Sequence, residues 1–248
     1  MAKVSVIVVA AGSGGRFGGQ ENKIHAKLEG QPLFLRALQL FVNREDVCQT
    51  LLVVSPTEIE DIKSKFGPNI GFMGAELVAG GKDRHDSVAN GLSSVRDEAD
   101  LVVVHDAVRV CVAEAWIDSI VEAAAKTGAA VPVVPISSTI KRVGPDKTIG
   151  ETVDREGLYL AQTPQAFRRI ILQEAYEKLA AGELDLPGPI TDDAQIVAAA
   201  GTPVTAVDGD SRNIKITTRG DLPLAGAIVK ILPKKSAPKF GAFEEAQW

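Results

Sequence analysis

Short apolar runs alternate along the chain with longer segments in which apolar residues recur at helical spacing. The apolar runs predict strands at residues 4–9 (VSVIVV), 51–55, 76–79, 101–105 (LVVVH), 129–134 and 203–207. Runs rich in β-branched residues, without polar alternation, are typical of a parallel sheet that is buried on both faces. The helical spacing predicts helices at residues 32–41, 57–66, 83–95, 113–127, 168–181 and 220–232, with one more after PITDDAQ (189–195). A capping threonine is expected to open the second of these helices.

The alternation of strand and helix implies right-handed βαβ units. The sequence therefore predicts an α/β fold, a Rossmann-like and mostly parallel sheet flanked by helices, in a single domain over residues 1–232. The rhythm changes between about residues 138 and 162, where Gly and Pro turns in VGPDKTIGETVDREG (143–157) indicate hairpins rather than crossovers. We expect a β-arm that protrudes from the sheet there. Residues 233–248 lack periodicity and are expected to form a flexible tail.

Composition excludes several classes of protein. With 248 residues, 45% of them hydrophobic, the chain is long enough for a substantial core. A net charge of −5 argues against a nucleic-acid partner held by a broad basic face. No apolar run is long enough for a membrane span, and the N-terminal run lacks a convincing cleavage site. The two cysteines have no CxxC spacing, so we expect reduced thiols and a cytoplasmic protein.

A glycine-rich loop, AAGSGGRFGGQENK (10–23), follows the first predicted strand and contains Arg16 and Lys23. Ligands of open α/β sheets bind beyond the carboxyl ends of the strands, and glycines let backbone N–H groups approach phosphate oxygens. A Walker-type loop is excluded because Ile24 follows Lys23, and a dinucleotide fingerprint that starts at Gly12 fails at Phe17. A solvated surface loop and a polyphosphate cradle both remain open from these residues alone.

The loop resembles the nucleotide-binding loop of sugar-phosphate nucleotidyltransferases. More specifically, the chain is similar to the methylerythritol phosphate cytidylyltransferases through GGKDRHDSVANGL (80–92), VVHDAVR (103–109), TVDREGLYLAQTPQAF (152–167), ITDDA (190–194) and NIKITTRGDL (213–222), in that order. The resemblance spans roughly residues 4–230. It implies transfer of CMP from CTP to 2-C-methyl-D-erythritol 4-phosphate with release of pyrophosphate, in isoprenoid precursor biosynthesis. It also implies Mg²⁺ or another divalent cation with CTP, and a homodimer that forms through the β-arm.

The resemblance also implies the residues of the site. The matching catalytic positions, which carry the cations expected to stabilise the transition state or hold the acceptor phosphate, are Arg16, Lys23, Arg155 and Lys215. The matching substrate-binding positions are Ala10, Ala11, Gly12, Ser13, Gly14, Gly81, Lys82, Ser87, Asp106, Ala107, Arg109 and Thr163. Asp106 is also a candidate metal ligand, and Arg155 and Thr163, in or beside the arm, are expected to reach the partner's site.

Elementary chemistry adds expectations for single residues. Asp106 ends a buried strand, where a carboxylate requires a partner. His105 before it is expected to be a satisfied core histidine, and Arg84 to belong to an ordinary helix start. Lys215 alternates with two isoleucines and is expected to point away from them on a strand. The ITDDA motif, residues 190–194, is explained by helix capping.

Two other functions remain open. A cytidylyltransferase for ribitol 5-phosphate or another pentitol phosphate shares the nucleotide half, and would differ at Val108, Val110 and Ser137, where this chain departs from the usual family pattern. A non-catalytic nucleotide-binding protein would keep the fold. Cations expected on both sides of a reacting phosphorus speak against the latter.

Overall fold

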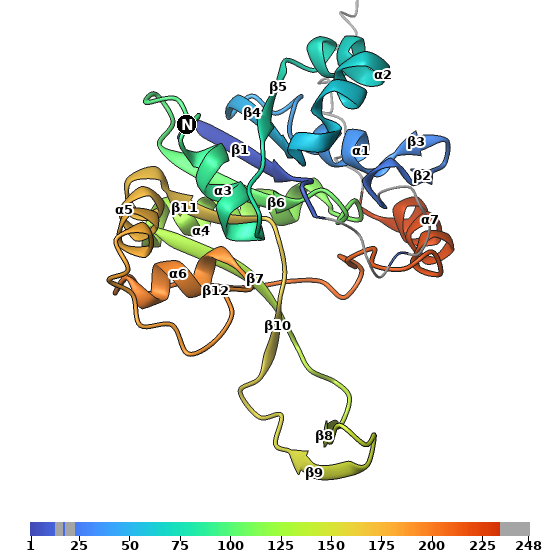
Figure 1. Cartoon of the computed structure of the whole chain (residues 1–248), viewed down its shortest axis with the longest axis vertical. Helices are drawn as coiled ribbons and strands as arrows, with labels where there is room; N and C mark the ends of the chain where they lie inside the picture. Colours follow the sequence, from blue (N-terminus) through green and yellow to red (C-terminus); the bar gives the residue numbers. More distant parts are fainter. Residues whose placement is uncertain (13–16, 18–22, 234–248) are drawn as a thin grey trace, which may run out of the picture.

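The computed structural model describes residues 1–12, 17 and 23–233. At its centre lies a sheet of strand order β10-β7-β11-β6-β1-β4-β5, with β12 paired to β7 (Figure 1). The strands are β1 (Val4–Val9), β4 (Val47–Val54), β5 (Ala75–Ala79), β6 (Leu101–Asp106), β7 (Ala129–Pro135), β10 (Tyr159–Ala161), β11 (Gln165–Arg168) and β12 (Thr205–Asp208). β1 pairs in parallel with both β4 and β6, β4 with β5, and β7 with β12. Only β10 and β11 run antiparallel to their neighbours in this sheet, so the predicted mostly parallel α/β fold is confirmed.

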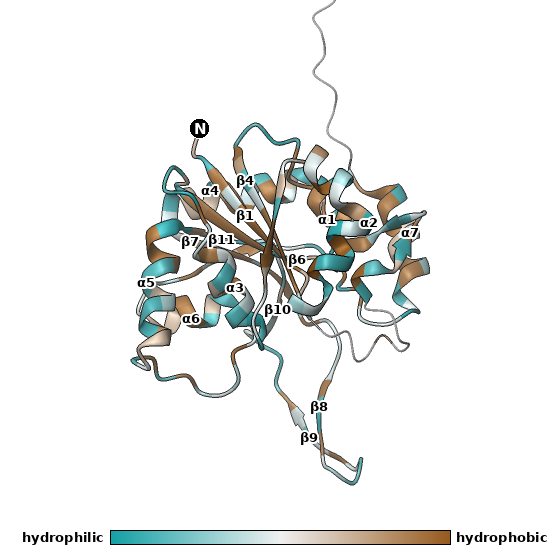
Figure 2. Cartoon of the chain, turned by 45° about the horizontal axis from the view of Figure 1, so that its top comes forward, coloured by the Kyte–Doolittle hydropathy of each residue, from teal (hydrophilic) through white to brown (hydrophobic). Residues whose placement is uncertain are grey.

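Helices cover both faces of the sheet. They are α1 (Leu33–Gln39), α2 (Ile59–Phe72), α3 (Arg84–Leu92), α4 (Glu114–Thr127), α5 (Arg169–Ala180), α6 (Asp193–Ala199) and α7 (Asp221–Ile231). Alternate residues of β1 point to opposite faces: Val6 and Val8 pack in one apolar cluster with α1, α2, α4 and α7, and Ile7 packs in the other with α3, α5 and α6. Apolar residues accordingly follow the central strands in Figure 2.

The β8–β9 hairpin lies outside the main sheet. β8 (Ile140–Val143) and β9 (Ile149–Val153) form a separate antiparallel pair that extends away from the body in Figure 1. The chain then returns to the sheet through β10, which pairs with β7. Large apolar side chains are exposed on β8, β9 and the returning segment: Val143, Ile149, Leu158, Tyr159 and Leu160. We call residues 138–162 the arm.

Several elements differ from those expected. The Thr57 cap was wrong: a 3-10 turn (Pro56–Glu58) precedes α2, and the Thr57 hydroxyl interacts with that of Ser55 instead. α2 also continues through Pro68 to Phe72, six residues beyond the expected end. α6 begins inside PITDDAQ rather than after it. The short strand β11 was not expected, and neither was the two-stranded pair β2 (Lys27–Leu28) and β3 (Gln31–Pro32).

The strand order fixes where a ligand can bind. From β1 the chain builds β4 and β5 on one side, and then crosses to β6 on the other side of β1. The carboxyl ends of β1 and β6 therefore lie at the point where the strand order reverses, which is the usual ligand site of such sheets. Val9 pairs with Asp106 in this register, so the carboxylate stands beside the start of the glycine-rich loop.

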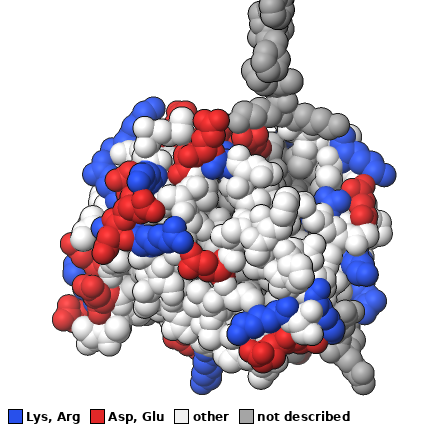
Figure 3. All heavy atoms as spheres, turned by 90° about the horizontal axis from the view of Figure 1, so that it is seen from above, with Lys and Arg blue, Asp and Glu red and all other residues white. Residues whose placement is uncertain are grey.

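Neither a membrane-spanning helix nor, on the face drawn in Figure 3, a broad basic surface is found in the part of the chain that the structure describes. Within it, no helix combines the length and the apolar character that crossing a membrane would require. On the face drawn in Figure 3, basic and acidic side chains are intermixed, and no broad basic surface forms there.

Candidate functional site

A cavity of about 440 Å³ opens at the carboxyl ends of β1 and β6. We call it the central cavity. Its lining combines segments that are far apart in the sequence: Val9, Ala10, Ala11, Gly12, Lys23, Ile24, Ser55, Gly81, Lys82, Asp83, Arg84, Ser87, Asp106, Val108 and Lys215. The fold thus brings together most of the described residues that the sequence predicted for the site.

Close backbone packing shapes one wall of the central cavity. The N–H groups of Ala10 and Gly80 donate to the carbonyls of Val53 and Val54, each at 2.7 Å. A Cβ atom on Gly80 would lie only 2.5 Å from that of Ala11, so this contact requires glycine. Next to it, the Gly81 N–H donates to Ser87 Oγ at 3.1 Å, which ties the segment before α3 to the first turns of that helix.

Asp106 is the charged centre of the cavity. Its side chain is 9% exposed, and its two oxygens lie 2.8 Å from Lys215 Nζ, 3.3 Å from Arg84 Nε and 3.7 Å from Arg109 Nε. Burial alone would raise the pKa of Asp106, but Arg84 and Lys215 outweigh it and hold that pKa well below its usual range. The partner required by a buried carboxylate is therefore present three times over, and Asp106 is ionised.

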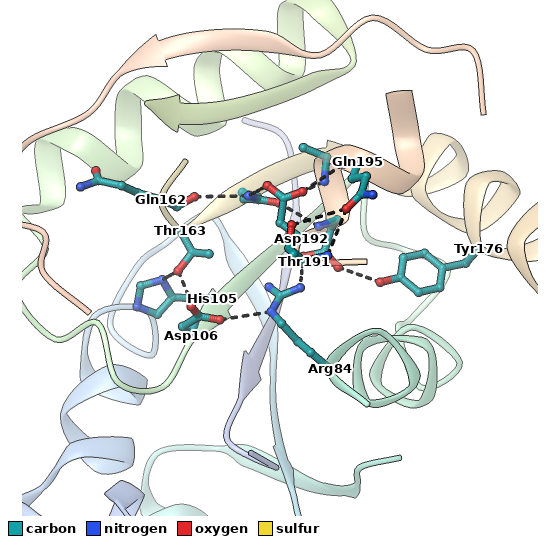
Figure 4. Close-up of polar contacts among 12 residues, drawn as sticks. Arg84, His105, Asp106, Gln162, Thr163, Tyr176, Thr191, Asp192 and Gln195 are labelled. Atoms are coloured by element: carbon teal, nitrogen blue, oxygen red, sulfur yellow. Dashed lines mark hydrogen bonds and ion pairs between the residues drawn. The ribbon is translucent and has the colours of Figure 1, made fainter. Parts of the chain in front are cut away.

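Arg84 is the functional candidate that the sequence did not single out. It is the first residue of α3, yet its guanidinium turns into the central cavity and links two carboxylates. Besides the contact with Asp106, which Figure 4 shows, its NH1 donates to Asp193 Oδ2 at 2.9 Å. The pKa of Arg84 is raised because the two carboxylates outweigh the effect of burial. The sequence signal for Arg84 was its position after two glycines at a helix start. Its pairing with α6 could not be predicted in this way, because it is a tertiary contact.

His105 and Thr163 form hydrogen bonds that hold the backbone at Asp106. His105 Nε2 lies 2.8 Å from the Arg109 carbonyl, which can only accept, so Nε2 carries the proton and Nδ1 accepts from the Thr163 hydroxyl at 3.1 Å. The Thr163 oxygen in turn accepts the Asp106 N–H at 3.0 Å. Burial lowers the pKa of His105 to about 4, so the ring is neutral. His105 is a satisfied core histidine, as predicted.

Thr163 corrects one expectation. It was expected in or beside the arm, with its side chain reaching a partner subunit. In the structure it lies in the body of its own chain, 4% exposed, because its hydroxyl is held between His105 and the Asp106 backbone. Its hydroxyl therefore contacts His105 and the Asp106 backbone of its own chain, and Thr163 is not among the residues that line either cavity.

A second cavity, of about 650 Å³, adjoins the first. We call it the arm cavity. It is lined by Arg109, Val134, Pro135, Ile136, Ser137, Ser138, Tyr159, Leu160, Ala161, Gln162, Ser211, Asn213, Ile214 and Lys215. Lys215 borders both cavities and does not belong to a strand, contrary to expectation. It lies in an irregular segment that the Ile216 N–H fixes to the Val108 carbonyl at 3.0 Å.

The remaining predicted residues lie outside the described range, in the core or on the arm. Ser13, Gly14 and Arg16 fall outside the described residues, as do residues 234–248 of the expected tail. Ala107 is fully buried, and its N–H donates to the Val9 carbonyl at 3.0 Å. Arg155 lies on the arm, exposed, where it donates to the Ser137 carbonyl.

The described residues do not form an obvious metal site. Both Asp106 oxygens already face cations, so a divalent ion could bind there only by displacing one of them. Asp83, His85 and Asp86 bring ligand atoms within 4.8 Å of one another. Their geometry is that of a helix start, since the Asp83 N–H donates to Asp86 Oδ2 at 2.9 Å.

Comparisons with known proteins agree with this geometry. Residues 4–231 match the family model described as 2-C-methyl-D-erythritol 4-phosphate cytidylyltransferase. Relatives of that name from Syntrophus aciditrophicus and Rhodopirellula baltica are each 40% identical to the chain, covering 92% of it and 96% and 95% of their own lengths. The crystal structure of the Thermus thermophilus protein of that name superposes with a TM-score of 0.75 at 32% identity, covering 93% of this chain and all of its own. The chain therefore belongs to the 2-C-methyl-D-erythritol 4-phosphate cytidylyltransferase family.

Proposed function

We propose that this protein transfers the cytidylyl group of CTP to 2-C-methyl-D-erythritol 4-phosphate, releasing pyrophosphate and forming the diphosphocytidyl product used in isoprenoid biosynthesis. Family membership over residues 4–231 supports the reaction. The observation that carries the proposal is the central cavity, where Lys23 and Lys215, from distant parts of the sequence, flank one space beside Asp106. Two cations around one space suit a reaction in which negative charge accumulates on phosphorus.

CTP would occupy the central cavity. Backbone groups of the glycine-rich loop, from Ala10 onward, would hold its phosphates, and Gly81, Lys82 and Ser87 would surround the cytosine. The proposal is supported by the close packing of Gly80 on Ala11, which joins these two walls. A divalent cation, Mg²⁺ in the first instance, would enter as the metal complex of CTP, as part of the substrate.

The acceptor phosphate would attack the α-phosphorus in line. One oxygen–phosphorus bond forms, the bond from the α-phosphorus to the bridging oxygen breaks, and pyrophosphate leaves with the electron pair. A phosphate monoester dianion is already a nucleophile near neutral pH, so the reaction needs no general base. Arg16 and Lys23 would neutralise the charge on the phosphates, and Lys215 would position the attacking phosphate.

The arm cavity would hold the acceptor. Arg109 and Lys215 stand where the two cavities meet, which supports a phosphate site there. We further propose a homodimer that forms through the arm and brings Arg155 to the partner's site; the exposed apolar side chains of the arm support it. A cytoplasmic location also belongs to the proposal, and the two free cysteines fit a reducing compartment.

Pyrophosphate release tests this function. The purified protein is incubated with CTP and Mg²⁺, and with 2-C-methyl-D-erythritol 4-phosphate, with ribitol 5-phosphate or with no acceptor. We expect release only with the methylerythritol phosphate. Preference for ribitol 5-phosphate would keep the mechanism and change the acceptor, and silence with both acceptors would leave a nucleotide-binding fold without this activity.

A further inference from the structure

A chain of buried polar contacts leads away from the central cavity to the layer of α5 and α6. Asp106 contacts Arg84 Nε at 3.3 Å, and Arg84 NH1 donates to Asp193 Oδ2 at 2.9 Å. The Tyr176 hydroxyl donates to the other oxygen, Asp193 Oδ1, at 2.7 Å. In Figure 4, dashed lines lead from Asp106 to Arg84 and onward to Tyr176.

Helix capping does not explain Asp193. The neighbouring Asp192 is the N-cap of α6, because its side chain accepts the Gln195 N–H at 3.0 Å. Asp193 is the next residue and is fully buried, and each of its two oxygens has a single strong donor. A buried carboxylate is costly without such partners, so its presence here calls for a further reason.

The three cations around Asp106 are not equally close or equally buried. Lys215 is its closest cation, but that side chain is 38% exposed and borders both cavities. The Arg109 Nε contact, at 3.7 Å, is too long for a hydrogen bond. If Lys215 turns to the acceptor phosphate, as the proposed function requires, Arg84 is the remaining close partner of the Asp106 carboxylate.

Asp193 also offsets part of the positive charge around Asp106. Three cations, Arg84, Arg109 and Lys215, face two carboxylates, Asp106 and Asp193, while His105 is neutral. One positive charge is left over, which suits an incoming phosphate. Without Asp193, the whole guanidinium charge of Arg84 would be available to pull on Asp106 or on a bound phosphate.

We propose that Asp193, fixed by Tyr176, is a positioning residue that acts through Arg84 to hold Asp106 in place when Lys215 engages the acceptor phosphate. The inference rests on the proposed function. Asp193 and Tyr176 lie outside the lining of the two cavities, so neither is expected to touch the substrate. Their effect on the rate must therefore pass through Arg84.

A double-mutant cycle tests this route. The variants Asp193→Asn, Arg84→Met and their combination are compared with the wild type in pyrophosphate release with CTP and methylerythritol phosphate. We expect Asp193→Asn alone to lower kcat/KM for the acceptor about 10²-fold, the scale of a misplacement of about 1 Å. In the Arg84→Met background the same change should alter kcat/KM by no more than about twofold, because the two residues act as one unit.

Asp192→Asn is the matched control. It removes the same charge one residue earlier, has no contact with Arg84, and asparagine preserves a helix cap. We expect its kcat/KM to stay within about twofold of the wild type, the usual limit of additivity for independent sites. If Asp193→Asn fails to fold, Tyr176→Phe replaces it in the cycle, since it removes one hydrogen bond and keeps the ring; a loss of about 3- to 10-fold is expected.

The outcomes separate the inference from the function on which it rests. A wild type that releases no pyrophosphate with either acceptor would overturn the proposed function, and the inference with it. An active wild type with unchanged kcat/KM in Asp193→Asn, or in Tyr176→Phe where that variant stands in, would overturn the inference alone. Equal losses in both Arg84 backgrounds would also overturn it, because the effect would then not pass through Arg84.

Discussion

His105 shows how burial sets the charge of one side chain in the site. It is fully buried between the Thr163 hydroxyl and the Arg109 carbonyl, and both contacts are those of the neutral ring. Protonation would place a donor at Nδ1 as well, facing a hydroxyl that already accepts from the Asp106 N–H. The folded state therefore resists the proton that an unfolded chain accepts.

This resistance predicts acid sensitivity. The pKa of His105 is about 4 in the folded state, and about 6.5 is the ordinary value. Above pH 6.5 neither state binds the proton; as the pH falls from there toward 4, the unfolded state binds it and the folded state does not. The free energy of unfolding should therefore fall by about 2 kcal/mol between pH 7.5 and 5, measured by urea titration.

Variants separate His105 from the other titrating groups. His105→Gln should be less stable at pH 7.5 but should lose this part of the pH dependence. His85→Gln, which changes a histidine at the start of α3, should keep it. An equal pH dependence in His105→Gln and wild type would contradict the prediction.

Lys23 offers a prediction on rate. It lines the central cavity, where a preorganised cation is expected to stabilise the transition state. Lys23→Ala should lower kcat by about 10²–10³-fold, measured by pyrophosphate release, while the thermal unfolding midpoint stays unchanged. Lys27→Ala removes an exposed lysine just beyond it and is the control, with wild-type kcat expected. A similar loss in both variants would point to a general charge effect.

At the scale of elements, glycines in two helices should respond in opposite ways to the same change. In α3, a Cβ atom on Gly91 would lie 2.8 Å from Ile7 Cγ2, whereas in α2 a Cβ atom on Gly71 would meet nothing within 4 Å. Gly91→Ala should lower the free energy of unfolding by about 1–3 kcal/mol through overpacking. Gly71→Ala should raise it by about 0.5–1 kcal/mol because alanine favours the helix. Urea titration of both variants checks this, and a shift of the same sign would contradict the packing of α3 on β1.

The strands and helices that could be predicted are those with a signal in their own local sequence. The central parallel strands could be predicted because a strand buried on both faces is mostly apolar, as in β1, apart from Ser5, and in the first four residues of β6. β11 could not, since its four residues, QAFR, carry no period of their own, and the first three are buried by their neighbours in the sheet while Arg168 is exposed. α2 was predicted to end too early because Gly67 and Pro68 normally stop a helix, and here they do not.

The residues of the site also divide into those that the local sequence could place and those that it could not. Residues that follow strands β1 and β6 could be placed at one sheet edge from the sequence, because parallel strands share their carboxyl ends. The link from Arg84 to Asp193 could not be predicted, since it depends on α3 and α6 packing on the same face of the sheet. Both residues looked like ordinary helix starts, and local sequence holds no signal for a contact between two such starts.

At the scale of the whole molecule, the arm raises the question of assembly. Its exposed apolar residues, with exposures of 54% for Val143 and 65% for Ile149, would be covered if the arms of two chains packed together. Arg155 lies on the same segment and is not among the residues that line the central cavity of its own chain. A site completed by the partner's Arg155 would account for both observations.

Mixing two inactive variants tests this arrangement. In a dimer of one Lys23→Ala chain and one Arg155→Ala chain, only the site with an intact Lys23 and the partner's intact Arg155 would work. Random exchange makes half of the dimers mixed, each with one working site of two, so about a quarter of wild-type pyrophosphate release should return. Lys23→Ala mixed with Lys215→Ala is the control: both lysines line the central cavity of one chain, so no site regains the pair. Subunit exchange, shown with differently tagged chains, without recovery in the first mixture would mean that Arg155 serves its own chain or none.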